Sequence, residues 1–180
     1  ARPMDAAEAA QAVPVVRWKA DNDPDRAVRL ESVRTLGEIA DTASVDYLEA
    51  LLLNGAAGVD LRETALSALL SRTPGAAGIR AAVEREIAAK DQKPVEMMVR
   101  VLSQAKAAEI VPVLVRLLDS QGWTVRLYAV RGLAANGATE AAARLAEMAE
   151  KDPAAAVRAE AARARETLAV TPAAPSASGR

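Results

Sequence analysis

The sequence of 180 residues contains no cysteine, no histidine and no phenylalanine. Without cysteine there can be no disulfide, no thiolate nucleophile and no cysteine-bound metal. Without histidine there can be no Ser-His or Cys-His catalytic pair and no imidazole metal site. The nine glycines are scattered among turns and form no phosphate-binding loop. Paired carboxylates could still act, but most acids alternate with arginine and lysine, as on solvated helix surfaces. We therefore expect no catalytic residues, no metal, no cofactor and no enzymatic activity.

Aromatic residues make up only 2% of the chain and hydrophobic residues 51%, so Ala, Leu and Val must fill the core. Small side chains bury little area each, and burial contributes about 25 cal/mol per Å². We therefore expect modest stability per structural unit. The net charge of −1 removes the general attraction to nucleic acid or to anionic membranes. The sequence also has no apolar run long enough to span a membrane.

The clearest pattern is in residues 23–53, where two apolar stripes of helical spacing follow each other. The first stripe begins at Val28 and the second at Val45, and the short run 41–44 separates them. Asp23 or Asp25 can cap the first helix, and Pro24 suits its first turn. Two amphipathic helices joined by so few residues must lie antiparallel, and a pair of this size needs neighbours to bury both stripes.

The same pattern recurs along the chain. Leu36, Leu69, Leu102 and Leu133 follow at steps of 33, 33 and 31 residues, and a second series keeps the same steps: Val33, Leu66, Val99 and Val130. A period of this length, kept by one class of residue, indicates a solenoid of helix pairs.

On these residues the chain resembles the HEAT-repeat family, in particular the short bacterial HEAT-like type of phycobilisome lyases. The resemblance rests on five short segments: 28–37, 125–134, 157–158, 12–14 and 110–112. It implies an all-α fold, an α-solenoid of about four to five antiparallel helix-pair HEAT-like repeats. It spans roughly residues 6–169 and implies little about function.

The repeats predict a single solenoid over residues 6–170, between an N-terminal arm (1–5) and a Pro/Ala/Ser tail (171–180). Within the solenoid we expect a half repeat (6–20), four repeats (23–53, 58–88, 94–118 and 123–150) and a capping helix (153–169). Lys19 and Arg165 stand where other copies carry apolar residues, as polar end caps require. An upstream repeat missing from the chain would also explain the half repeat.

The acidic stretch 21–25 resembles the opening of a calcium loop. A true EF-hand loop has Gly at its sixth place and Glu at its twelfth, where this chain has Arg26 and Ser32. Capping of the following helix explains these acids without a cation.

One arginine recurs in most repeats, as Arg29, Arg62, Arg126 and Arg158, and Val95 replaces it in the third. We interpret this arginine as part of the scaffold, paired with acids of an adjacent turn. The exception at Val95 indicates a drier junction.

The resemblance implies that second helices line the concave face, so partner-binding residues should lie on those helices outside their apolar stripes. The groove predicted in this way is apolar and aromatic at its N-terminal end and charged toward its C-terminal end. Its candidate residues are Val15, Trp18, Tyr47, Arg85, Val113, Arg116 and Arg144. Alternatively, Trp18 and Tyr47 only cover gaps between repeats.

Edge positions supply further candidate contacts. Trp123 begins a first helix and either covers the seam between repeats or meets a partner. Thr73 and Pro74 lie in the longest turn of the repeat array, where a loop should protrude. The tail 171–180 has a disordered composition and is a candidate for docking on a partner or on the groove.

We expect a non-enzymatic scaffold or assembly subunit that binds a protein or peptide. The alternative is a nucleic-acid-binding array similar to the alkylpurine DNA glycosylases, although acids interleave with the arginines of the groove. A third hypothesis, a bilin lyase or lyase accessory, rests on the resemblance alone. The chain begins at Ala1 rather than Met, which fits a cleaved signal peptide, a processed subunit or a trimmed chain. We expect a soluble protein of the bacterial cytoplasm, or of the periplasm after signal removal.

Overall fold

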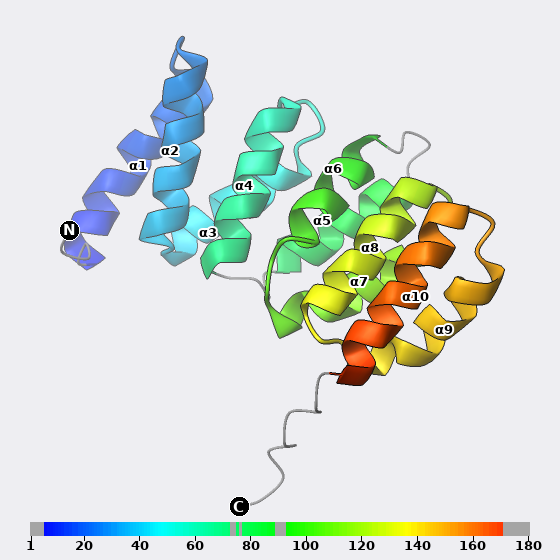
Figure 1. Ribbon diagram of the computed structural model, residues 1–180. Helices are drawn as coiled ribbons and strands as arrows, with labels where there is room; N and C mark the ends of the chain where they lie inside the picture. Colours follow the sequence, from blue (N-terminus) through cyan, green and yellow to red (C-terminus); the bar gives the residue numbers. More distant parts are fainter. Residues whose placement is uncertain (1–5, 73–74, 76, 89–92, 171–180) are drawn as a thin grey trace, which may run out of the picture. The chain divides into compact units, whose positions relative to one another are not determined.

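Figure 1 shows a computed structural model that describes residues 6–72, 75, 77–88 and 93–170. These residues form ten α-helices and two short 3-10 helices, without any strand. The helices are α1 (Ala6–Asn22), α2 (Arg26–Ile39), α3 (Thr42–Leu53), α4 (Val59–Arg72), α5 (Ala77–Ala88), α6 (Lys93–Leu102), η1 (Ala108–Ile110), α7 (Val111–Leu117), α8 (Trp123–Ala135), η2 (Thr139–Ala141), α9 (Ala142–Lys151) and α10 (Ala155–Val170). The predicted all-α class is confirmed.

Aspartates begin the helices of the first repeat. The Asp25 carboxylate caps α2 by accepting a hydrogen bond from the backbone N–H of Ala27 at 2.8 Å. Asp41 caps α3 in the same way by accepting from the N–H of Ser44 at 2.8 Å. Between these helices Ala40 has a φ of 51°, and this left-handed residue ends α2 and turns the chain within two residues. The two helices are therefore antiparallel, as the sequence predicts.

The chain divides into two compact units, residues 1–101 and residues 102–180. In the first unit α2 packs beside α4, while α3 packs on both α4 and α5, and α1 packs along α2. In the second unit α8 packs beside α10, with α7 along α8 and α9 along α10. Each unit thus has a layer of first helices (α2 and α4; α8 and α10) and a layer of second helices (α1, α3 and α5; α7 and α9).

The repeated aliphatic positions form the core of these layers. Leu36, Leu69, Leu102 and Leu133 are buried, as are Val33, Leu66, Val99 and Val130. Arg165 of α10, which stands at the repeat position of Leu133, is exposed. Burial of both series in every copy agrees with the repeat period found in the sequence.

Some predicted segments differ in detail or fall outside the described residues. α1 continues as one helix through Pro14, whereas the matching Pro112 stands at the start of α7, after the 3-10 turn η1. Thr73, Pro74, the arm 1–5 and the tail 171–180 lie outside the described residues, and so does the docking hypothesis for the tail. The division into a half repeat, four repeats and a capping helix stays a prediction.

Candidate functional site

The outer face of α1 carries two large exposed apolar side chains. Val15 is 58% exposed and Trp18 is 61% exposed. They are three residues apart on one helix and so lie side by side on its surface. The opposite face of α1 holds the buried residues Ala9, Val13 and Ala20. α1 therefore has one apolar face in the core and a second one in solvent.

Tyr47 on α3 is buried and ties α3 to the end of α1. Its hydroxyl donates a hydrogen bond to Asp21 Oδ1 at 2.6 Å, and the guanidinium of Arg17 lies 5.0 Å from its ring centroid. Burial raises the pKa of the Tyr47 phenol well above its usual range, and the hydrogen bond to Asp21 raises it further. Tyr47 therefore covers the junction between two second helices, as the alternative interpretation proposed.

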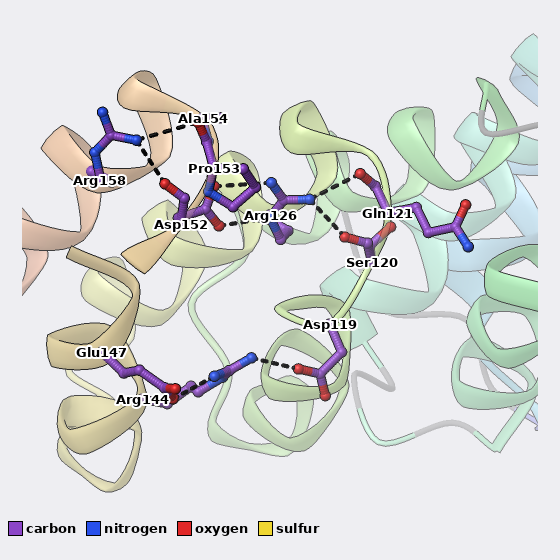
Figure 2. Close-up of polar contacts among 10 residues, drawn as sticks. All are labelled: Asp119, Ser120, Gln121, Arg126, Arg144, Glu147, Asp152, Pro153, Ala154 and Arg158. Carbon is purple, nitrogen blue, oxygen red and sulfur yellow. Dashed lines mark hydrogen bonds and ion pairs between the residues drawn. The ribbon is translucent and has the colours of Figure 1, made fainter. Parts of the chain in front are cut away.

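A matching bond joins α9 to the end of α7. Arg144 occupies the repeat position of Tyr47, and Asp119 occupies that of Asp21. Figure 2 shows Arg144 between Asp119 and Glu147, with its guanidinium donating to Asp119 Oδ1 at 2.9 Å and to Glu147 Oε2 at 2.5 Å. The Glu147 bond is the main cause that raises the pKa of Arg144. In both units a donor side chain of one second helix thus reaches an aspartate at the C-terminal end of the preceding second helix, Asp21 in the last turn of α1 and Asp119 just after α7.

Arg85 on α5 makes a related contact with α3. Its guanidinium donates to the backbone carbonyl of Leu53, the last residue of α3, and to Glu86 Oε1 at 2.5 Å. Burial alone would raise the pKa of Glu86, but hydrogen bonds from Arg85 and Arg62 hold that pKa below its usual value. Arg85 therefore contributes to packing between second helices, although its side chain is 42% exposed.

The other predicted residues are distributed between the interior and the surface. Val113 is buried, so its side chain offers little surface to a partner. Arg116 is exposed on α7. Trp123, the first residue of α8, is 51% exposed, so half of its surface stays open. Thr73 and Pro74 cannot be placed, because they lie outside the described residues.

Of the seven predicted groove residues, Val15 and Trp18 lie together on α1, while Tyr47 of α3 contacts Asp21 and Arg17 of α1. Sequence reasoning missed the role of Arg17, which lies over Tyr47, and treated Lys19 only as a polar cap. Both basic residues are exposed beside Trp18. The sequence did contain a signal for this site, because the two basic residues flank Trp18 within the short segment 17–19.

The recurring arginine has a scaffold role, but its expected pairing with acids is seen for Arg62 and Arg126, whereas Arg29 and Arg158 donate to backbone carbonyls. Arg29, Arg126 and Arg158 each donate through Nη1 to two backbone carbonyls, those six and five residues earlier in the chain. Figure 2 shows this geometry for Arg126 and Arg158. These carbonyls belong to the links between helices, so the arginine fixes the backbone of the link that leads into each first helix. Val95, which replaces this arginine, is fully buried.

The buried pair Arg126–Asp152 strengthens this scaffold in the second unit. Arg126 Nε and Nη2 donate to the two Asp152 oxygens at 2.8 and 2.9 Å, and both side chains are at most 10% exposed. Burial alone would raise the pKa of Asp152, but the hydrogen bond from Arg126 and one from the N–H of Ala154 hold it below its usual range. This carboxylate therefore stays ionised and paired in the fold.

Within residues 6–72, 75, 77–88 and 93–170, no cluster of acidic side chains could hold a metal ion. Asp23 and Asp25, candidates for a calcium loop, instead accept hydrogen bonds from the backbone N–H groups of Asp25 and Ala27. A cavity of about 540 Å³ between α2 and α4 lies in the layer of first helices and contains none of the predicted site residues. In the same part of the chain, no helix has the length and apolar character needed to cross a membrane.

Comparisons with known proteins agree with this architecture. The family model described as HEAT repeats matches residues 79–165, and the model described as PBS lyase HEAT-like repeat matches residues 28–54. No curated protein matches the chain. Among solved structures, the complex of CpcE and CpcF of phycocyanin lyase from Nostoc sp. PCC7120 aligns with a TM-score of 0.54 at 23% identity.

That alignment covers 87% of this chain and 64% of the lyase chain, so this chain spans less than two thirds of its length. A crystal structure of an engineered protein aligns with a TM-score of 0.48 at 20% identity and covers 89% of this chain and 80% of that chain. The likeness to the lyase chain concerns the fold. The two family matches and the repeated helix pairs show that the chain belongs to the HEAT-like repeat family, and the likeness to the lyase chain agrees with an α-solenoid fold.

Proposed function

We propose that this chain is a non-enzymatic binding protein that holds a protein or peptide partner on its second-helix surface, with Val15 and Trp18 at the centre of the contact. The observation that carries the proposal is the exposure of these two neighbouring side chains, 58% and 61%. Exposed tryptophan next to an aliphatic residue is the usual composition of a protein-binding anchor. The absence of histidine and cysteine from the sequence supports a role without catalysis.

Repeat positions strengthen this argument. Val15 shares its repeat position with Tyr47 and Val113, which are 9% and 7% exposed. In these two copies the position is therefore part of a packed interface, whereas Arg144, at the same position of α9, has a side chain that is 43% exposed. Val15 is an apolar residue at this position on the open face of α1, and such a residue suits an interface with another molecule.

The test is capture of the native partner by the tagged chain from an extract of its source cells, analysed by mass spectrometry. Trp18→Ala should reduce capture of the specific partner by tenfold or more, about 1.4 kcal/mol, since anchor side chains of this kind contribute at least that much. Trp123→Ala is the matched control, because it removes the other exposed tryptophan from a different helix. Undiminished capture by Trp18→Ala would reject this placement of the site.

A lyase-related subunit is a second candidate, favoured by the match of residues 28–54 to the PBS lyase HEAT-like repeat. In this case the partner captured by the chain would be a second lyase subunit or a phycobiliprotein, and Trp18→Ala would release it. Copurification of a bilin-carrying protein, visible in the absorbance spectrum, would favour this candidate.

The nucleic-acid alternative has weaker support from the site. Arg144 and Arg85 are both engaged by carboxylates, and the open face of α1 is centred on apolar side chains, with only Arg17 and Lys19 as cations beside them. A salt titration with duplex DNA distinguishes the alternatives, because phosphate neutralisation gives a steep loss of affinity with salt. We expect no such binding at physiological salt.

A further inference from the structure

We infer that the exposed face of α1 binds an α-helix of the partner, stacked parallel to α1 in the register of the chain's own second helices and bearing acidic residues beside its apolar stripe. The inference rests on the proposed function, because it names the class of partner for the same surface. It is carried by the contacts that join successive second helices and by the charges around Trp18.

The first step concerns how second helices stack in this chain. Since α1 and α3 are both antiparallel to α2, they are parallel to each other. Tyr47 of α3 donates to Asp21 at the end of α1, and Arg85 of α5 donates to the carbonyl of Leu53 at the end of α3. In the second unit Arg144 of α9 donates to Asp119, just after α7. In each of these three contacts, therefore, the earlier second helix packs on the same face of the second helix that follows it.

The second step applies this register to α1. Val15 stands at the position of Tyr47 and Arg144, and Trp18 stands one turn further on. Val15 has no polar atom in its side chain and cannot donate to an aspartate of an earlier helix. A helix stacked here in the same register would instead meet Val15 and Trp18 with apolar residues, which removes both from water.

The third step concerns charge. Segment 14–20 carries Arg17 and Lys19 and no acid. Arg17 lies over the Tyr47 ring, and the Lys19 side chain makes no hydrogen bond or ion pair with any described residue. Asp21, the nearest acid, already accepts from Tyr47. The hydrogen bond from this neutral phenol leaves the charge of Asp21 in place, so residues 14–21 carry a net charge of +1 beside the open face. Acidic side chains of the incoming helix would complement this charge.

A single-stranded nucleic acid could also stack a base on Trp18 beside two cations. The aliphatic surface of Val15, together with the helix-stacking register, favours a protein helix over this ligand. Binding of an oligonucleotide is therefore treated as a contrary outcome of the experiment.

The experiment uses the full chain with Trp123→Phe, which leaves Trp18 as its only tryptophan. An amphipathic helix of about 18 residues, or five turns, is attached before Ala1 through a Gly/Ser linker. Because α1 has 17 residues and is about 25 Å long, a parallel stack needs a linker of about 20 residues. The tether gives an effective concentration of about 1 mM, so a weak complex is still detected.

Two versions of the helix share one apolar stripe and differ only in their flanking residues, glutamate or lysine. We expect the glutamate version to shift Trp18 emission to the blue and to reduce its quenching by acrylamide, and the lysine version to do neither. Lys19→Glu should reverse this preference. Lys151→Glu, an exposed lysine near the end of α9, should leave it unchanged.

Equal protection of Trp18 by both versions would overturn the acidic partner class, and protection by neither would overturn helix stacking. Quenching of Trp18 by a single-stranded oligothymidine at physiological salt would also overturn the inference. Because the pull-down with Trp18→Ala is independent of the attached helix, failure of the inference can be distinguished from failure of the proposed function.

Discussion

Ser44 is a polar residue that is buried without a hydrogen bond from its side chain to any described residue. Its side chain is fully buried, and its hydroxyl has no hydrogen-bond partner among the described residues. The matching positions of the other copies hold Ala12, Ile79, Ile110 and Ala141. We expect Ser44→Ala to raise the free energy of unfolding by about 1 kcal/mol, because an unpaired buried hydroxyl costs at least this much. Urea unfolding followed by circular dichroism measures the change.

Ser32 provides the matched control for this substitution. It is also buried, but its hydroxyl donates to the carbonyl of Val28 at 2.8 Å. Ser32→Ala should therefore have no stabilising effect. Equal gains in both variants would point to helix propensity rather than to the unpaired hydroxyl of Ser44.

The hydroxyl of Tyr47 gives a second prediction at the scale of a single residue. Tyr47→Phe keeps the buried ring and removes the bond to Asp21, so the free energy of unfolding should fall by about 1 kcal/mol. Because its pKa is raised in the fold, the phenol of Tyr47 should stay protonated at pH values where the phenol of an unfolded chain ionises. Stability from this group is complete below the unfolded pKa of about 10 and decreases as the pH rises above it.

Ultraviolet absorbance during an alkaline titration tests the burial of Tyr47. The variant Tyr128→Phe keeps Tyr47 as its only tyrosine. Its tyrosine absorbance should change only well above pH 10, with or after unfolding. A change near pH 10 in the folded variant would contradict the buried position of Tyr47.

At the scale of elements, the close approach of α2 and α4 depends on Gly37. A Cβ atom at this position would lie 2.5 Å from the Cβ of Ala68 on α4. Gly37→Ala should therefore separate the two helices and lower the free energy of unfolding by about 1–3 kcal/mol. Thermal unfolding measures this loss, and the double variant Gly37→Ala with Ala68→Gly should recover part of it.

Gly55 is the control for this change, because a Cβ there would meet no atom within 4 Å. Gly55→Ala should leave the thermal midpoint close to that of the wild type. A similar loss in both variants would show that backbone conformation, rather than the contact between α2 and α4, determines the effect of residue 37.

The pair Arg126–Asp152 joins α8 to the link between α9 and α10. Since the pKa of Asp152 is lowered in the fold, the folded chain holds this proton less tightly than the unfolded chain. The stabilisation is present above the unfolded pKa of about 3.9 and is lost as the pH falls through the lower folded pKa. Asp152→Asn should cost about 3 kcal/mol near neutral pH, because it leaves a buried arginine without its counter-charge.

Urea unfolding between pH 2.5 and pH 7 tests this prediction. Asp152→Asn should flatten the acidic part of the stability curve without abolishing it, because the pKa values of Asp60 and Glu86 are also lowered. Asp119→Asn is the control, since that carboxylate is 56% exposed and its ion pair should contribute little. Parallel curves for Asp152→Asn and the wild type would contradict the role of the pair.

At the scale of the whole molecule, stability should vary along the chain. Each helix of a solenoid is held mainly by its neighbours, and the terminal helices have fewer of them. We expect backbone amides of α1 and α10 to exchange with deuterium faster than those of α3 and α8, which mass spectrometry of peptic fragments can measure. Equal protection along all four helices would contradict this prediction.

Much of the architecture could be predicted from the sequence, whereas much less of the candidate site could. The stripes around Leu36 and Leu133 are buried as expected, and the recurring arginine is part of the scaffold. Among the groove residues, however, the sequence pattern treated Val15 and Val113 alike. One is 58% exposed and the other 7%. A pattern within one helix cannot show which neighbouring helix covers a given face.

The sequence by itself determined the helical class, the repeat period and the identity of the core positions. These follow from spacings within a helix and between copies, which are visible along the chain. Only the tertiary structure decided which side chains outside the core are open, paired or covered. Tyr47 of α3 is contacted by Asp21 and Arg17 of α1, while Trp18 of α1 stays exposed to solvent. Burial depends on residues distant in sequence, and so the binding surface emerged only when the helices were packed.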